Sequence, residues 1–494
     1  MPRAAPHSQQ GLNPEGSHPK PARAIAFYLP QYHRIPENDA WWGENFTEWT
    51  NVRRAAPLFE GHHQPRVPAD LGYYDLTEAA VMERQAELAR RHGIEGFCLY
   101  YYHFEESKKL LDMPLRRMLA SGQPDFPFCL CWANETWSRL WDGDDHHILV
   151  EQKYRSQDLD AFARGVIPAF SDPRYIRVEG KPLLLIYRAR SIPDTKAVVE
   201  RWRHLWREEA GLEVHLCAAL TRGEDRPGEL GFDSAVEFPP YGCRGAIGKE
   251  QFPTHGVPNN FPGALTDYRL NVLLQLQQPS TADVPLYPTV TLEWDNTARR
   301  KVGMHVFLHF HLTSYYQWLS GAVTRSREQN GPDQSFVFIN AWNEWAEGAY
   351  LEPDEKWGSS LLEMTSAALD GRSLEELWPT TILSESTKAR LQREWLQDAD
   401  AKTIPPLWPA FSDLQQAYAA LQKEYGLAMG EIAKHQTLLA QKKAELQEVK
   451  DLKKQSDSAH KALQRQMATI KPPWPVRLWR RCRRPTPPAS LPHD

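Results

Sequence analysis

The chain lacks the features that would assign it at once to a membrane, zinc or nucleic-acid class. No apolar run reaches the roughly 18 residues that a transmembrane helix needs. None of the six Cys residues forms a CxxC pair, so a zinc site built on cysteines is not indicated. The net charge is −5, which provides no global positive field for nucleic acid. The composition is otherwise that of an ordinary globular protein.

Several common catalytic motifs are also missing. No GxGxxG or GxxxxGK[ST] follows an apolar run, which counts against a nucleotide-binding sheet. No GxSxG elbow and no HExxH pair occurs, so neither a serine nucleophile nor a zincin-type site is indicated. Histidine pairs such as His62 and His63 are expected at the surface. We therefore expect no metal site.

The two ends of the chain differ in composition from its middle. Residues 1–22 are rich in Pro, Gly, Ser and His, without the apolar core of a signal peptide, so we expect a disordered segment and a cytoplasmic protein. Residues 471–494 form a basic Trp/Arg tail, and 471–488 suit peripheral contact with an anionic inner-membrane surface. A solvated disordered tail is the alternative.

Eight short apolar runs recur between residues 23 and 342, and most precede a stretch with helical spacing. Uninterrupted apolar runs are typical of strands covered on both faces. The alternation favours an α/β fold, a (β/α)8 TIM barrel with insertions over 23–372, rather than a doubly wound open sheet. The expected strands lie within 23–30, 93–102, 127–134, 182–188, 212–220, 234–240, 285–294 and 335–342, and the expected helices within 76–93, 107–121, 156–170, 194–210, 265–277 and 312–327.

A C-terminal helical extension follows the expected barrel. Residues 373–410 are mixed and proline-bearing, which suggests a linker. Residues 411–470 repeat apolar positions at alternating spacings of four and three, which predicts a short or imperfect coiled coil that could join two copies of the chain. A helix folded back on the barrel is the alternative.

Eighteen Trp residues are a heavy load, and many of them stand with acids, amides and other aromatic residues where the expected strands end. In a TIM barrel the carboxyl ends of the strands build the active site. Aromatic walls with a few convergent polar groups suit a carbohydrate. No cluster of Lys and Arg stands at these strand ends, so a phosphate clamp is not indicated. The candidate sugar-binding residues are Tyr32, His33, Trp41, Trp42, Glu48, Trp49, Tyr101, Tyr102, His103, Trp132, Asn134, Glu135, Trp137, Glu237, Trp294, Asp295, Asn296, Asn343 and Trp345.

Two acids after the last run are the candidate catalytic pair. Glu344 and Glu347 lie three apart in INAWNEWAEGAYLEPD (339–354), and glycosidic cleavage usually needs two carboxyls. On a straight strand they would face opposite sides, so they can converge only if the chain turns after Trp342, and Gly348 makes such a turn plausible. The alternative is one catalytic glutamate and one that bonds the backbone.

Seven blocks in order resemble the WbsX-type, glycoside hydrolase family 99-like proteins, over roughly residues 23–370. They are YLPQYHRIPENDAWWGENFTEWTNV (28–52), GHHQPRVPADLGYYDL (61–76), GIEGFCLYYYHF (93–104), FPFCLCWANETWSRLWDG (126–143), GKPLLLIYR (180–188), WDNTAR (294–299) and FINAWNEWAEGAYLEPD (338–354).

This resemblance implies a (β/α)8 carbohydrate-active enzyme of bacterial O-antigen or capsule metabolism, with an oligo- or polysaccharide substrate and neither metal nor organic cofactor. By the same resemblance, Glu344 would deprotonate the sugar 2-hydroxyl to give an anhydro-sugar, and Glu347 would act as acid and then base, as in retaining endo-α-mannosidases. Those hydrolases tend to have His where this chain has Ala346. The alternatives are a glycosyltransferase that uses the same pocket and a non-catalytic glycan-binding scaffold.

Overall fold

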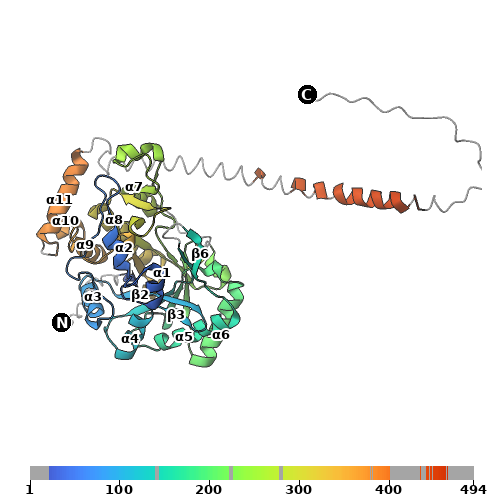
Figure 1. Ribbon diagram of the computed structural model, residues 1–494, viewed down its shortest axis with the longest axis horizontal. Coiled ribbons are helices and arrows are strands. Elements are labelled where there is room, and N and C mark those ends of the chain that lie inside the picture. Colours follow the sequence, from blue (N-terminus) through green and yellow to red (C-terminus); the bar gives the residue numbers. More distant parts are fainter. Residues whose placement is uncertain are drawn as a thin grey trace, which may run out of the picture. The chain divides into compact units, whose positions relative to one another are not determined.

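The computed structural model describes residues 22–139, 144–221, 226–277, 282–378, 380, 382–400, 434–435, 441–443, 445–447, 449–462 and 464–465 (Figure 1). The chain divides into two units, Met1–Gln397 and Asp398–Asp494.

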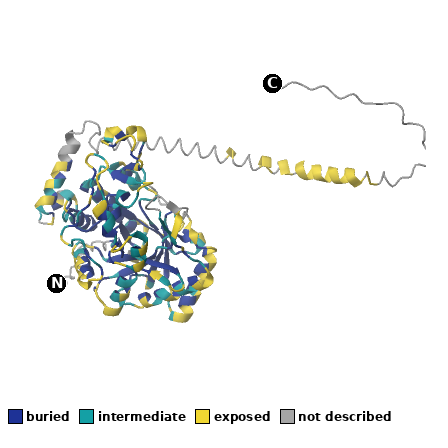
Figure 2. Cartoon of the chain, in the orientation of Figure 1, coloured by how far each residue is buried: buried dark blue, intermediate teal, exposed yellow. Residues whose placement is uncertain are grey.

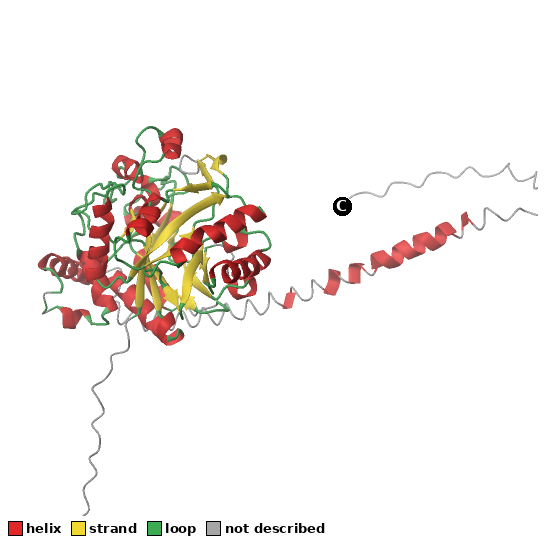
Figure 3. Ribbon diagram, turned by 90° about the horizontal axis from the view of Figure 1, so that it is seen from below, coloured by secondary structure: helices red, strands yellow, loops and turns green. Residues whose placement is uncertain are grey.

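The first unit is a closed barrel of eight parallel strand positions (Figures 1 and 3). Each position pairs with the next along the chain, and the last strand returns to pair with the first. This strand order confirms the predicted (β/α)8 barrel and excludes the open sheet. In ring order the strands are β1 (Arg23–Tyr28), β2 (Gly96–Glu105), β4 (Phe128–Trp132), β8 (Lys181–Ile186), β9 (His215–Leu220), β10 (Ser234–Glu237), β13 (Leu286–Tyr287) with β14 (Thr289–Thr291), and β16 (Phe336–Asn340).

Pro288 divides the seventh strand position into two pieces. Leu286 and Tyr287 pair with β10, whereas Thr289 to Thr291 pair with β16. Proline has no N–H to donate to a ladder, but its carbonyl still accepts a hydrogen bond from Phe338 N at 2.9 Å. The ring of strands therefore closes across the proline.

Aromatic side chains fill the barrel interior. The ring of Phe27 on β1 lies 5.8 Å from Tyr100 on β2, 4.9 Å from Phe238 and 5.4 Å from Phe338 on β16. Side chains alternate along a strand, so the interior position of Tyr100 puts Tyr102 inside as well and turns Tyr101 and His103 outward. This alternation decides which candidate residues can meet at the barrel mouth.

Helices cover the outer face of the barrel, with their buried stripes toward the strands (Figure 2). All six predicted helical stretches contain a helix, although two of them begin with a short strand. The helices are α1 (Pro36–Trp42), α2 (Glu48–Arg54), α3 (Ala79–Arg91), α4 (Met113–Ser121), α5 (Ser156–Phe170), α6 (Thr195–Ala210), α7 (Tyr268–Leu276), α8 (Leu312–Gln329), α9 (Ser360–Leu369), α10 (Leu374–Leu377) and α11 (Glu385–Asp400).

Short strands outside the barrel decorate its loops. They were not predicted, because their sequences, such as KKL, WSR and DDHHILV, are not the apolar runs that mark a buried barrel strand. They are β3 (Lys108–Leu110), β5 (Trp137–Arg139), β6 (Asp144–Val150), β7 (Arg177–Val178), β11 (Ala246–Ile247), β12 (Ala264–Asp267), β15 (His305–Leu308), β17 (Asn343–Glu344) and β18 (Ala349–Tyr350).

The beginning of the predicted linker packs on the barrel. Leu377, Leu383 and Leu391 are fully buried. Glu394 of α11 accepts a hydrogen bond from Leu312 N at 2.8 Å, which satisfies an orphan donor at the N-terminus of α8. Leu377, Leu383 and Leu391 therefore extend the barrel's hydrophobic core.

The predicted coiled coil at 411–470 lies largely outside the described residues. The parts described there are helical and exposed, with Leu446 55%, Val449 60% and Leu452 58% exposed. The predicted N-terminal segment, apart from Ala22, and the basic tail at 471–494 also lie outside the described residues. Among the described helices, none is both long and apolar enough to cross a membrane.

Candidate active site

A tight hairpin follows the last barrel strand and carries the two candidate acids. Asn343 and Glu344 of β17 pair with Tyr350 and Ala349 of β18, and the 3-10 turn Trp345–Glu347 joins them. Gly348 ends this turn at φ +66°, and a Cβ there would lie 2.9 Å from Arg66 Cζ. Only glycine fits both the backbone and the space. The turn after Trp342 that the sequence requires is therefore present.

Glu344 and Glu347 converge on one guanidinium. Arg299 Nη1 donates to Glu347 Oε1 at 2.9 Å, and Nη2 donates to Glu344 Oε2 at 3.2 Å. Arg299 also donates to Glu48 Oε1, from Nε at 3.0 Å and from Nη2 at 2.9 Å. Because the ion pairs join both acids to a single planar fork, their bonded oxygens lie within roughly 8 Å of each other, close enough for two carboxyls to act on one glycosidic bond. We call Glu48, Arg299, Glu344 and Glu347 the Arg299 cluster.

The Arg299 cluster holds more acid than base. Burial raises the pKa of Glu344 to about 8, and Glu347 and Glu48 add to the increase while Arg299 opposes it. Burial alone would lower the pKa of Arg299, but Glu48, Glu347 and Glu344 hold it well above its ordinary value. Glu344 therefore keeps a proton at neutral pH, since it is buried and shares one arginine with two other acids.

Two backbone anchors fix the acids. The side-chain amide of Asn343 accepts from Leu29 N at 2.7 Å and donates to Leu29 O at 3.0 Å, which ties the hairpin to the end of β1. Asp295 N donates to Glu347 O at 2.7 Å. Both anchors are groups that the sequence offered as sugar ligands, and both are buried. Their observed role is to hold the hairpin.

Two of the candidate tryptophans pack beneath the hairpin. Trp345 stacks on Tyr350 with ring centroids 3.8 Å apart and donates from Nε1 to Glu352. Trp49 lies 5.4 Å from Trp345 and donates to Tyr74 O. Both indoles are at most 4% exposed, so they support the site from below rather than face a ligand.

Four aromatic rings lead outward from the barrel interior. Tyr100 lies 6.5 Å from Tyr102, Tyr102 lies 5.0 Å from Trp137 of β5, and Trp137 lies 6.0 Å from Trp41 of α1. Trp41 and Trp137 are half-buried. Gln31 Nε2 donates to Tyr102 OH at 3.1 Å. We call Tyr100, Tyr102, Trp137 and Trp41 the aromatic wall.

Two further candidates lie at opposite ends of this region. Tyr32 donates to Asn343 O. Burial raises the pKa of its phenol, and Glu48 and Glu344 add to the increase, which places it beside the Arg299 cluster. Trp42 lies beside Phe46 and takes the Arg139 guanidinium on its ring at 5.2 Å, at the outer edge of α1.

Four candidates face away from the barrel mouth. Tyr101, His103 and Trp132 pack against Phe162 of α5 on the outside of the barrel. Glu237 accepts from Thr289 N and from Arg325 of α8, so it joins the barrel wall to a covering helix. The expectation that these residues line a sugar site is wrong, because strand alternation turns them outward. His33 is also buried, with neither ring nitrogen bonded to a described residue.

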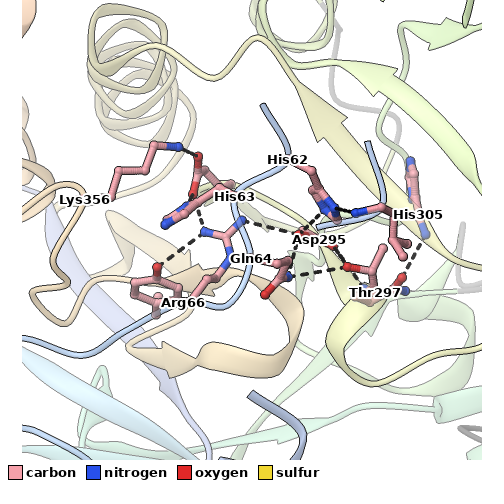
Figure 4. Close-up of polar contacts among 12 residues, drawn as sticks. His62, His63, Gln64, Arg66, Asp295, Thr297, His305 and Lys356 are labelled. Carbon is pink, nitrogen blue, oxygen red and sulfur yellow. Dashed lines mark hydrogen bonds and ion pairs between the residues drawn. The ribbon is translucent and has the colours of Figure 1, made fainter. Parts of the chain in front are cut away.

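A charged network next to Glu347 contains three further candidates, Trp294, Asp295 and Asn296 (Figure 4 shows Asp295 and its partners). Asp295 Oδ2 accepts from His62 at 2.9 Å and from Gln64 at 2.7 Å, and Arg66 pairs with Glu293. His62 is buried, which contradicts its expected surface position. Asn296 accepts from His305 N, and Trp294 is buried. This network shapes the loop that carries Arg299.

Asn134 and Glu135 lie on the far side of the barrel mouth, where both bond Arg188. Arg188, Arg299 and Tyr100 are not among the site residues predicted from the sequence. All three occur inside quoted motifs, but an arginine or a tyrosine within a motif gives no sign of which way it points. Among the described residues, no group of three or more His, Cys, Asp or Glu side chains is arranged to hold a metal ion.

Comparison with known proteins identifies the family. The model described as "Glycosyltransferase WbsX" matches residues 24–365. The chain belongs to the WbsX glycosyltransferase family. The match covers the barrel that carries the Arg299 cluster and stops before α10.

Two curated relatives are similar in sequence to this WbsX family member. Both are described as "Uncharacterized protein WxcX", and they come from two strains of Xanthomonas campestris pv. campestris. Each is 45% identical over 353 residues, which is 71% of this chain and 50% of the relative. The chain thus spans about half the length of the curated relatives it matches.

Solved structures similar to this WbsX family member include a glycoside hydrolase-like protein and an endo-alpha-mannosidase. A "Glycoside hydrolase-like protein" has a TM-score of 0.47 at 13% identity, and the alignment covers 73% of this chain and 97% of the chain of that protein. A GH99 endo-alpha-mannosidase from Bacteroides thetaiotaomicron has a TM-score of 0.44 at 13% identity, covering 70% and 96%. The barrel assignment itself follows from the strand order described above.

Proposed function

We propose that this chain is a carbohydrate-active enzyme of bacterial surface polysaccharide metabolism, which acts on O-antigen or capsule glycans. Its catalytic pair is Glu344 and Glu347. The observation that carries the proposal is the convergence of both carboxyls on Arg299 at the carboxyl end of the barrel. That end is where TIM-barrel enzymes build their sites.

The proposed reaction begins with proton transfer at the sugar ring. Glu344 takes the proton of the 2-hydroxyl, and the resulting oxygen attacks the anomeric carbon to form an anhydro-sugar. Glu347 gives a proton to the leaving glycosidic oxygen, so the bond breaks as the ring closes. The raised pKa of Glu344 makes its carboxylate a stronger base than an ordinary glutamate, and it also means that Glu344 must first lose its own proton, so the base is formed mainly above pH 8.

The second step restores the configuration. Glu347, now ionised, takes a proton from an incoming hydroxyl, whose oxygen opens the anhydro ring, and Glu344 returns its proton to the sugar oxygen. Water as the incoming group gives hydrolysis, whereas a sugar hydroxyl gives transfer. The family description as a glycosyltransferase favours transfer to a sugar acceptor as the second candidate.

Arg299 supports both steps as a positioning residue. Each carboxyl gives Arg299 only one oxygen in these ion pairs. Glu347 keeps 19% of its side chain exposed, whereas Glu344 keeps 7%. The more exposed acid is the one assigned to the leaving group, which must reach solvent or an acceptor.

The test is turnover of defined O-antigen and capsule oligosaccharides, followed by mass spectrometry, with and without an added acceptor sugar. Glu347→Gln should lower turnover by a factor of about 100 to 10,000 while glycan binding survives. Glu60→Gln, a change of the same kind at an exposed acid, is the matched control. Ordinary turnover by Glu347→Gln would reject the catalytic assignment. A new bond formed only with the acceptor would favour transfer.

Two C-terminal segments, residues 411–470 and 471–488, are the proposed contacts with partners. We propose that residues 411–470 join two copies of the chain and that 471–488 contact an anionic membrane surface. Light scattering of the full chain and of a chain ending at residue 410 would test the first role. Co-sedimentation with vesicles containing an anionic phospholipid would test the second.

A further inference from the structure

Arg188 stands across the barrel mouth from the acids. It follows β8 by two residues, and β8 is the fourth of the eight strand positions whereas β16 is the eighth. In a closed ring of eight, the fourth and eighth positions are opposite. Arg188 therefore rises from the side of the mouth farthest from Glu344 and Glu347.

The guanidinium of Arg188 reaches over the end of the barrel. Its Nε donates to Glu135 Oε1 at 2.7 Å, and its Nη2 donates to Tyr241 OH at 2.9 Å. Glu135 follows β4 and Tyr241 follows β10, on either side of β8 in the ring. A side chain that starts at β8 and touches both lies over the side of the barrel mouth that β4 to β10 form.

The guanidinium is also rigidly held. Its central carbon lies 4.6 Å from the ring centroid of Tyr187 and 5.0 Å from that of Tyr241. Asn134 fixes the backbone, since it accepts from Arg188 N at 2.8 Å and donates to Arg188 O at 2.9 Å. Little side-chain freedom remains to be lost when a ligand binds.

One donor of this guanidinium is unused. Nη1 of Arg188 has no partner among the described residues, although Arg188 is only 8% exposed. A buried N–H of a charged group is costly when it is left unpaired. The side chain of its counter-ion, Glu135, is 44% exposed, so water screens the acid more than the arginine.

We propose that Arg188 binds an anionic substituent of the substrate, either the carboxylate of a uronic acid or a phosphate on the glycan or its carrier. The inference rests on the proposed function, because it assigns the ligand of the same barrel mouth. In the Arg299 cluster the one guanidinium is already paired with three acids, so it is not available to an anion, whereas Arg188 attracts it. A substrate with one anionic group is thereby oriented, with its neutral ring over the acids.

Matched small probes test this assignment without turnover. Ligand-observed NMR titrations compare methyl glucoside, methyl glucuronide and glucose 1-phosphate on the full chain. We expect at least one anion to bind about tenfold or more tightly than the neutral sugar. Preference for the glucuronide indicates a uronate, and preference for the phosphate indicates a phosphorylated group. Equal binding of all three probes overturns the proposal.

Variants separate recognition from support of the fold. Arg188→Gln should abolish the anion preference, and Arg188→Lys should keep part of it because the charge remains without the fork. Tyr241→Phe keeps the ring, loses the hydroxyl that holds Nη2, and should reduce the preference severalfold. Arg201→Gln, which removes an exposed arginine paired with Asp160, is the control.

Glu135→Gln provides the sharpest contrast. It removes the competing anion of Arg188 and should strengthen anion binding severalfold, an effect that a purely structural ion pair would not produce. Unchanged anion affinity in both Glu135→Gln and Arg188→Gln overturns the proposal. Because Glu347→Gln should leave the anion preference intact, failure of the catalytic pair and failure of this inference give different results.

Discussion

Asn343 satisfies both backbone hydrogen-bonding groups of Leu29 with its side-chain amide. These two hydrogen bonds join the end of β1 to the hairpin that carries Glu344 and Glu347. A residue offered by the sequence as a sugar ligand is instead the anchor of the candidate catalytic loop.

Replacing this anchor should destabilise the barrel. Asn343→Leu leaves Leu29 N and O unpaired and buried, and we expect a loss of about 2–4 kcal/mol in the free energy of unfolding. Urea denaturation at pH 7 measures it, with the exposed Asn259→Leu as control. If stability is unchanged and only glycan affinity falls, Asn343 is a sugar ligand after all.

The stability of the protein should depend on the protonation of Glu344. Its pKa is raised to about 8 in the folded state, above the ordinary value near 4.5, so between these values the folded state binds more protons than the unfolded state. Stability therefore falls as pH rises from about 4.5 to 8. In Glu344→Gln, the free energy of unfolding should fall less between pH 4.5 and 8 than in wild type, by on the order of a few kcal/mol.

Denaturation at a series of pH values checks this slope. The pKa of Glu352 is raised to about 7 by its burial, so wild type retains a second contribution over part of the window. The difference between wild type and Glu344→Gln isolates Glu344. Parallel curves for the two proteins would contradict the prediction.

Activity should follow the same group with the opposite sign. If Glu344 is the base, only its ionised form reacts, and kcat/KM should rise with pH and level off above about 8. Initial rates across pH 5.5–9.5 measure this profile. A rate that falls through pH 8 would make Glu344 the proton donor and exchange the roles of the two acids.

Removal of Arg299 should cost more than removal of a surface arginine. Arg299→Gln leaves Glu48, Glu344 and Glu347 without their shared cation, and we expect a loss of about 3–5 kcal/mol. The loss should grow at high pH, where the acids must ionise. Arg201→Gln should cost at most about 1 kcal/mol. Equal losses in the two variants would show that the ion pairs contribute little.

The aromatic wall and the outward-facing indoles should respond differently to truncation. Trp137→Ala removes a half-buried ring beside Tyr102 and should weaken glycan binding about tenfold with a small effect on folding. Trp132→Ala empties a core position against Phe162 and should cost about 3–5 kcal/mol of stability. Glycan titration and thermal unfolding of both variants separate the effects. Glycan affinity unchanged in Trp137→Ala would remove the wall from the binding site.

The order of the barrel could be predicted from the sequence because both faces of its strands are buried. Such strands are apolar throughout, and eight apolar runs separated by helical spacing leave few other arrangements. Glu344 and Glu347 could be selected for a related reason, since two acids directly after a buried strand are costly unless something pairs with them or uses them.

The direction of each side chain could not be predicted in the same way. Along β2, Tyr100, Tyr101, Tyr102 and His103 have similar composition, and only the register of the strand decides that Tyr100 and Tyr102 face inward. Long-range pairings were also hidden. Arg299 meets Glu48 across 251 residues of sequence, and Arg188 meets Tyr241 across 53.

The barrel, its mouth and the two acids placed there could thus be predicted from the chain alone, because the apolar runs and their order are visible in the sequence. The folded structure was needed to show that one arginine holds both acids, that Asn343 and Asp295 anchor their loop, and that Arg188 lies opposite. These contacts join distant segments, and their geometry exists only after the ring of strands has closed.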